Sequence, residues 1–182
     1  MDFSHRSVLL QESVKALNLR PDGIYLDGTL GGAGHSLEIA KQLTTGRLIG
    51  VDQDQMALAA AKERLDPYRD RVTLVHGNFR DLGQILDDLG LAAVDGMLFD
   101  LGVSSPQLDK AERGFSYMAD APLDMRMDQT APLTAYQVVN TWSREELRRI
   151  LFAYGEERYA RRISAAILAA RAKKRLFIRG TY

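Results

Sequence analysis

The chain contains no cysteine, and this absence excludes several kinds of site. No thiol is available to form a disulfide framework, to bind zinc as a thiolate or to act as a cysteine nucleophile. No apolar run approaches the roughly 18 residues that span a bilayer, and residues 1–6 do not begin a secretory signal. We therefore predict a cytoplasmic protein of bacterial type, with no membrane partner and no metal site.

The chain lacks a net charge as well, because 24 Lys and Arg residues balance 24 Asp and Glu residues. The balance hides a gradient: residues 143–182 hold eleven basic side chains and four Glu, so the rest of the chain is acidic. An acidic body with a basic end suits orientation on a polyanion. A solvated helix face explains the same charges, and both interpretations stay open.

Four short apolar segments alternate with helical patterns in the first hundred residues. Strands are expected at 24–27, 47–52, 72–76 and 94–100. Helices are expected at 34–43, 54–65 and 81–89. Strands and helices that alternate at this spacing form right-handed βαβ units, and these place the carboxyl ends of the strands along one edge, where ligands bind. The predicted fold class is α/β with a parallel sheet.

The alternation stops after Asp100. Residues 101–134 hold three prolines and three methionines and are predicted to form a long structured loop, a kind of segment that is usually functional. Helical patterns return from about Thr134. A second helix is predicted to start after a capping box at Ser143, and a third to run from Glu156 to about Lys174. This helical tail is predicted to be a second, smaller module. With four strands before it and none after it, the sheet is predicted to be incomplete.

A glycine-rich turn joins the first predicted strand to the first helix, Asp27-Gly28-Thr29-Leu30-Gly31-Gly32-Ala33-Gly34-His35. Such a turn lets a ligand approach the backbone closely, but dinucleotide, flavin and mononucleotide sites share it. Asp27 distinguishes better between these cofactors. Its carboxylate would repel the pyrophosphate of a dinucleotide, whereas it would attract the ammonium and sulfonium groups of S-adenosylmethionine. The alternative is that Asp27 only caps the turn.

Two further strand ends carry candidate cofactor contacts. Asp52 closes the second strand, where an acid can accept hydrogen bonds from both ribose hydroxyls, whereas Asp54 better fits a helix N-cap. After the third strand, Phe79 is placed to stack on an adenine ring and Asn78 to offer its amide to the base edge. Simple packing of Phe79 explains its position equally well.

The segment from Asp100 to Gln107 leaves the fourth strand beside the expected methyl group. Methylation of an amino group needs acceptors for its N–H hydrogens, so that the nitrogen lone pair points along the transfer line. Asp100 and a backbone carbonyl before Pro106 can serve, and Ser104 and Ser105 add hydroxyl groups. The alternative is a capped turn with a rigid proline.

Taken together, five motifs resemble the RsmH (MraW) family of bacterial small-subunit ribosomal RNA methyltransferases. They are Asp27-Gly-Thr-x-Gly-Gly-Ala-Gly-His35, Asp100-Leu-Gly-Val-Ser-Ser-Pro-Gln-Leu-Asp109, Arg113-Gly-Phe-Ser-Tyr117, Pro122-Leu-Asp-Met-Arg-Met-Asp128 and Tyr154-Gly-Glu-Glu-Arg158. The resemblance implies a Rossmann-like class I methyltransferase sheet with an inserted helical domain. The expected parts are a cofactor-binding domain at 1–109, a partial helical domain at 110–174 and an atypical end at 175–182.

The resemblance also implies site residues. The S-adenosylmethionine site would comprise Asp27, Gly31, Gly32, Ala33, Gly34, His35, Asp52, Phe79, Asp100 and Gln107. The catalytic residues would be Asp100, Ser104 and Ser105. The candidates for RNA phosphate contacts are Arg113, Arg126, Arg158, Arg161 and Arg162.

The function implied is direct methyl transfer to the N4 amino group of a cytidine in the decoding region of 16S rRNA, with the small ribosomal subunit as partner and a homodimer left open. No cysteine is present to attack the pyrimidine ring, so a covalent adduct is excluded. Family members are longer, and nothing aligns beyond Lys174, so we expect a truncated chain. The alternative is an inactive fragment that binds RNA or protein through its basic helices, whereas a nicotinamide-dependent dehydrogenase is disfavoured by Asp27 and the glycine spacing.

Overall fold

The computed structural model describes residues 8–177 and divides the chain into two units that meet between Gly102 and Val103. The first unit is built on a parallel sheet with strand order β3-β2-β1-β4. Its strands are β1 (Ile24–Asp27), β2 (Arg47–Asp52), β3 (Val72–His76) and β4 (Gly96–Leu98). The α/β class predicted from the sequence is confirmed, and β1, β2 and β3 have the predicted bounds.

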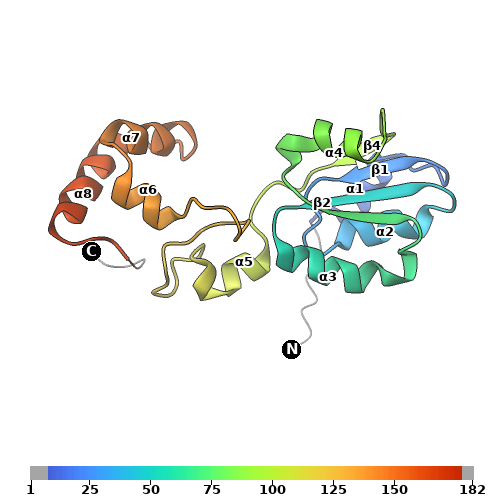
Figure 1. Cartoon of the computed structure of the whole chain (residues 1–182), viewed down its shortest axis with the longest axis horizontal. Helices are drawn as coiled ribbons and strands as arrows, with labels where there is room; N and C mark the ends of the chain where they lie inside the picture. Colours follow the sequence, from blue (N-terminus) through green and yellow to red (C-terminus); the bar gives the residue numbers. More distant parts are fainter. Residues whose placement is uncertain (1–7, 178–182) are drawn as a thin grey trace. The chain divides into compact units, whose positions relative to one another are not determined.

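Helices cover both faces of this sheet (Figure 1). They are α1 (Leu10–Ala16), α2 (Gly34–Gln42), α3 (Gln55–Leu65) and α4 (Leu82–Asp88), with the short 3₁₀ turns η1 (Asp66–Tyr68) and η2 (Phe79–Asp81). Successive side chains of a strand point to opposite faces, so Tyr25 joins the core beneath α1, α2 and α3. Its neighbour Leu26 joins a second core with Ile85 and Leu86 of α4.

The fourth strand is shorter than the predicted range of 94–100. Before it, Asp95 uses its carboxylate to accept the main-chain N–H of Ile24 at 2.7 Å and the guanidinium of Arg20 at 2.6 Å. After it, the main-chain N–H of Asp100 donates to the Thr29 hydroxyl at 2.6 Å rather than to a strand. Within residues 8–177, β4 pairs with β1 alone, so its outer edge has no strand beside it.

Helix ends also depart slightly from the predicted bounds. The structure adds α1, which the sequence analysis did not predict, and Val14 is the buried residue through which it packs. Asp54 lies outside α3 as its N-cap, accepting the N–H of Met56 at 3.0 Å, as the sequence indicated. The predicted helix at 81–89 is divided, since η2 precedes α4.

The second unit contains the remaining helices: α5 (Ser105–Asp109), η3 (Ala111–Arg113), α6 (Ala135–Thr141), α7 (Arg144–Ala153) and α8 (Ala160–Lys173). α8 packs against both α6 and α7. Beyond α8, Leu176 exchanges two hydrogen bonds with the Asn140 side chain, at 2.8 and 3.0 Å. This part of the expected atypical end is therefore tied to α6, while residues 178–182 lie outside the described part of the chain.

Two predictions for this second unit need correction. The segment 101–134 was expected to be loop throughout, but it contains α5 and η3. The last helix begins at Ala160 rather than Glu156, because Glu156 adopts a left-handed backbone with φ of 49° that cannot continue a helix. The predicted capping box at Ser143 is confirmed, with the Ser143 hydroxyl 3.2 Å from the N–H of Glu146. In the range 8–177, none of the helices has the length and apolar character to cross a membrane.

Candidate functional site

Four strand ends meet at one edge of the sheet in the first unit. The parallel register places Asp27 of β1 beside Gly50 of β2 and Leu98 of β4, and it places Asp52 beside His76 of β3. The glycine turn follows β1, Phe79 follows β3, and Asp100 follows β4, so the sequence-predicted contacts of this unit share one edge. This is the edge at which open α/β sheets bind ligands.

The glycine turn is fixed to the sheet through its backbone. The Leu30 N–H donates to the Val51 carbonyl at 3.1 Å, and the Leu30 side chain is buried against Gly50, where a Cβ would lie only 2.8 Å from it. The N–H of Gly31 donates to Oδ2 of Asp52 at 2.8 Å. On the far side, Arg64 of α3 donates to the Gly32 carbonyl at 2.8 Å. The turn is therefore held by β2 and α3 before any ligand arrives.

Space above the turn is open where a cofactor would approach. Gly31 has a left-handed φ of 49°, and a Cβ added there would meet only the Thr29 carbonyl, at 3.8 Å. A Cβ at Gly32 would meet nothing within 4 Å. Ala33 follows with a φ of 57° and is fully buried as the residue before α2. An exposed, fixed stretch of backbone of this kind fits the close approach of a nucleoside cofactor.

Asp52 is the acidic group nearest to this open backbone. Its Oδ2 accepts from Gly31, and its Oδ1 accepts the N–H of Asp54 at 2.8 Å. The carboxyl is half-buried, and burial raises its pKa above the ordinary value, although hydrogen bonds from the main-chain N–H groups of Asp54, Gly31 and Gln53 act in the opposite direction. A carboxylate has about four lone-pair sites, so the three N–H donors leave one that can still accept a hydroxyl hydrogen. This geometry is compatible with the predicted ribose contact.

Asp27 is more deeply buried than the sequence argument required. Its side chain is 1% exposed, accepts the Ser36 hydroxyl at 2.7 Å and accepts the Thr29 N–H at 3.2 Å. Burial raises the pKa of the Asp27 carboxyl, against the lowering effect of these two hydrogen bonds. These contacts favour the alternative in which Asp27 caps the turn, and its direct contact with a cofactor stays a prediction.

Two aromatic rings flank the open edge. Phe79 and Phe99 pack edge to face, with ring centroids 5.7 Å apart, and each is about two-fifths exposed. A Cβ at Gly28 would overlap with the Phe99 ring, so glycine is required there. Phe99 was not among the predicted residues, and the signal available was an aromatic at the end of the fourth strand. The Asn78 amide is engaged by Gln53 at 3.0 Å, which argues against its predicted contact with a base.

The remaining predicted residues of this unit lie at the ends of the site. Gly34 begins α2, and His35 beside it is buried with Nε2 3.2 Å from the Val8 carbonyl. Asp100 is exposed and held by its main chain to Thr29. Gly31, Gly32, Asp52, Phe79 and Asp100 thus all lie at or directly after strand ends on the same edge of the sheet.

Ser104, Ser105 and Gln107 belong to the second unit, where they build the start of α5. Ser104 is its N-cap, and Gln107 completes a capping box by accepting the Ser104 N–H at 3.0 Å. Gln107 is buried, and Pro106 lies in the first turn. This arrangement matches the capped turn considered in the sequence analysis, and the cofactor and catalytic roles of these three residues stay predictions.

Arg113 and Arg126 are engaged within the second unit. Arg113 is 2% exposed, and its guanidinium donates to the carbonyls of Arg126 and Met127 at 2.9 and 3.1 Å. A buried guanidinium cannot reach an RNA phosphate, so the predicted RNA contact of Arg113 is corrected to a structural role. Arg126 holds Asp124 through two hydrogen bonds of 3.0 and 2.6 Å, and this pairing lowers the pKa of Asp124. Most of its donors are occupied, which argues against an RNA contact there also.

Arg158, Arg161 and Arg162 are exposed, as an RNA-binding role requires. The guanidinium carbons of Arg158 and Arg162 lie 5.2 and 6.0 Å from the centre of the Tyr159 ring. This ring was not among the predicted site residues.

Within residues 8–177, no group of three or more His, Asp or Glu side chains is arranged to hold a metal ion.

Comparison with known proteins identifies the family. Residues 2–180 match the model of the MraW methylase family. The chain belongs to the MraW methylase family. The family predicted from the five motifs is thereby confirmed, and the match extends past Lys174, where the sequence analysis found no further alignment.

Curated relatives of the family are much longer than this chain. The chain is 61% identical to the ribosomal RNA small subunit methyltransferase H of Brevibacillus brevis, over 96% of this chain and 56% of the relative. It is 60% identical to the protein of the same name from Exiguobacterium sibiricum, over 93% of this chain and 54% of the relative. The chain therefore spans about half the length of the curated relatives it matches.

Among solved structures, the O-methyltransferase TomG from Streptomyces achromogenes, in complex with SAM, aligns with a TM-score of 0.47 at 22% identity. The alignment covers 55% of this chain and 46% of TomG.

Proposed function

We propose that the first unit binds S-adenosylmethionine at the edge formed by the glycine turn and Asp52. The observation that carries the proposal is the open backbone of Gly31 and Gly32, fixed by the hydrogen bond from Gly31 to Asp52. Membership of the MraW methylase family supports this choice of cofactor over other nucleosides. When bound, the cofactor supplies an electrophilic methyl group on a sulfonium.

Each residue of the edge has a distinct part in this proposal. Asp52 accepts a ribose hydroxyl through the lone pair that its three N–H donors leave. Phe79 offers an exposed ring edge to the adenine, supported from the side by Phe99. Asp100, exposed after β4, accepts an N–H of the amino group to be methylated and so directs the nitrogen lone pair toward the methyl carbon.

The proposed substrate is small-subunit ribosomal RNA, and the finer proposal is the N4 amino group of a cytidine in the decoding region of 16S rRNA. The names of the relatives at about 60% identity support the ribosomal RNA class. Transfer would be direct: the neutral amino nitrogen would attack the methyl carbon as the sulfur–methyl bond breaks and S-adenosylhomocysteine leaves. The nitrogen would then lose one proton to the Asp100 carboxylate or to water. A covalent adduct with the pyrimidine ring has no cysteine to form it in this chain.

Methyl transfer is tested by incubating the 182-residue chain with 16S rRNA and cofactor labelled in its methyl group. The expected result is N4-methylcytidine in the digested RNA, with transfer abolished in Asp100→Ala and preserved in Asp88→Ala, an acid of α4. Unchanged transfer in Asp100→Ala would reject its role.

A second candidate function is RNA binding without catalysis. It is favoured by one observation, that Arg158, Arg161 and Arg162 of the second unit are exposed. Cofactor binding together with RNA binding but no methyl transfer in the labelled assay would select this second candidate.

A further inference from the structure

Basic and aromatic side chains alternate where α7 ends and α8 begins. This group, termed the α7–α8 surface, consists of Arg149, Phe152, Tyr154, Arg158, Tyr159 and Arg162. The rings of Phe152, Tyr154 and Tyr159 are 66%, 78% and 51% exposed. Large rings this exposed contribute little to the folding of the unit, since they remain mostly in contact with water.

The buried side of the same helices shows that the rings are not needed for packing. Leu147 of α7 is 1% exposed, and Ala160 and Ser164 of α8 are buried, so the most buried positions of the two helices do not include the three rings. The residues of the α7–α8 surface come from exposed positions of α7 and α8 and from the loop between them.

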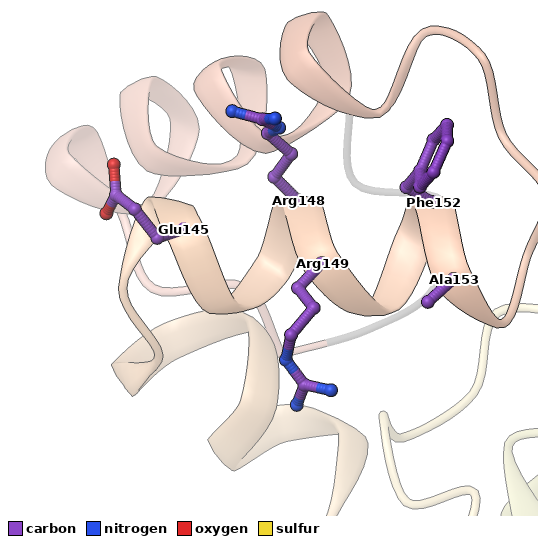
Figure 2. Close-up of a pocket in the computed structure, with 5 residues that line it drawn as sticks. All are labelled: Glu145, Arg148, Arg149, Phe152 and Ala153. Atoms are coloured by element: carbon purple, nitrogen blue, oxygen red, sulfur yellow. The ribbon is translucent and has the colours of Figure 1, made fainter.

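Guanidinium groups lie over two of the rings. The guanidinium carbon of Arg149 is 5.9 Å from the centre of the Tyr154 ring, and those of Arg158 and Arg162 are 5.2 and 6.0 Å from the Tyr159 ring. Figure 2 shows Arg148 and Phe152 extending to one side of α7 and Arg149 to the other. Together with Glu145 and Ala153, these residues line a hollow of about 360 Å³. Planar cations and rings are therefore interleaved along one helical hairpin.

The charge around these rings suits a polyanion. Residues 143–177 hold ten basic side chains and four Glu. Two of the four are engaged locally: Glu146 accepts the Ser143 hydroxyl at 2.7 Å, and Glu157 accepts the Tyr159 N–H at 2.7 Å. The arginines at Tyr159 and Tyr154 face no carboxylate within ion-pair distance in the described residues, so their charge is available to phosphates.

Rings and guanidinium planes together select single strands over duplexes. Unpaired bases can stack on aromatic side chains and on arginine, whereas the bases of a duplex are already stacked and offer only phosphates and 2′-hydroxyls to a protein. We propose that the α7–α8 surface binds single-stranded RNA, with bases stacked on Tyr159 and Tyr154 and phosphates held by the flanking arginines. The inference rests on the proposed function in taking RNA as the polyanion.

The test measures anisotropy of a labelled, mixed-sequence RNA single strand of about 12 nucleotides, a length within the usual site sizes, added to the 182-residue chain without cofactor. Tyr159→Leu is expected to weaken binding roughly five- to a hundred-fold, since it removes one stacking platform. Tyr159→Phe keeps the ring and should bind within about twofold of the unmodified chain.

The arginines are tested through the salt dependence of binding. Arg158→Gln should lower the slope of log affinity against log salt by about 0.7, the value for one phosphate contact on a single strand. Arg69→Gln removes an exposed arginine of the first unit and should leave the slope unchanged. An unlabelled RNA duplex of the same length should compete less well than the single strand.

Tyr154→Leu provides a second ring variant, since its greater exposure makes loss of folding a poor explanation for any effect, and circular dichroism verifies the fold of each variant. Equal RNA affinity for the unmodified chain, Tyr159→Leu and Tyr154→Leu would overturn the inference, as would preferred binding of duplex. Ring variants that change self-association but not RNA affinity would identify a protein interface instead, and would also overturn it. Loss of cofactor binding with RNA binding intact would count against the proposed function alone.

Discussion

Asp52 at the end of β2 accepts the main-chain N–H of Gly31 at 2.8 Å and so joins the second strand to the turn that follows the first. One carboxylate thereby fixes the backbone that a cofactor would approach and keeps a lone pair with which it can accept a further hydrogen bond. The structure of the turn and the proposed binding of the ribose depend on the same side chain.

Replacing this carboxylate should weaken cofactor binding. In Asp52→Ala the ribose loses a charged acceptor and Gly31 loses its partner, and hydrogen bonds to charged groups contribute about 1.5–3 kcal/mol. The Kd for S-adenosylmethionine, measured by calorimetry, should rise at least about tenfold. Asp54→Asn is the matched control, because asparagine caps helices as well as aspartate does, and it should bind as the unmodified chain does. Equal affinity in Asp52→Ala would contradict the role of Asp52.

The buried carboxyl of Asp27 should make stability depend on pH. Burial raises its pKa in the folded chain above the ordinary value of 3.8, so the folded state holds its proton at pH values where the unfolded state has lost it. Stability from this group is therefore complete below pH 3.8 and declines as pH rises through the folded pKa. Urea unfolding at several pH values should show a steeper decline for the unmodified chain than for Asp27→Asn. If the free energy of unfolding changed with pH in the same way for both chains, Asp27 would not contribute to the pH dependence of stability.

Gly28 and Phe99 should be energetically coupled. A Cβ at Gly28 overlaps with the Phe99 ring, and overpacking of this kind costs about 1–3 kcal/mol. Gly28→Ala should therefore lower the free energy of unfolding in the presence of Phe99 but much less in Phe99→Ala. A double-mutant cycle by urea unfolding measures this coupling, and additive effects would mean that the ring does not lie over the glycine.

Arg113 should matter for stability rather than for RNA. Arg113→Gln leaves the carbonyls of Arg126 and Met127 without their cationic donor, and the loss of such buried hydrogen bonds costs about 1–3 kcal/mol. Thermal unfolding should show this destabilisation, whereas exposed Arg161→Gln should change stability by less than about 0.5 kcal/mol. Unchanged thermal stability of Arg113→Gln together with weakened RNA affinity would contradict the structural role of Arg113.

The sequence predicted the sheet well because the bounds of most strands depend on neighbouring residues in the chain. Three strands begin and end at the predicted residues, since each is a short apolar run that ends at an Asp or His. The fourth is shorter because of contacts made by Asp95 and Asp100 with residues about seventy positions earlier in the chain. No local pattern contains such contacts.

The candidate site was predicted only in part, because some of its residues depend on contacts with parts of the chain that are distant in sequence. The place of Asp52 follows from its strand end, but the burial of Asp27 depends on Ser36 from the next helix. Arg113 resembles a surface charge in sequence, and only the return of residues 126–127 over it reveals its role. Phe99 gains its position from the absence of a side chain at Gly28.

Titration of S-adenosylmethionine into the unmodified 182-residue chain tests the central claim most directly. The account predicts saturable binding at one site per chain, unaffected by the ring variants of the second unit. Absence of binding, or binding that persists unchanged when Gly32→Val fills the open space above the turn, would contradict it.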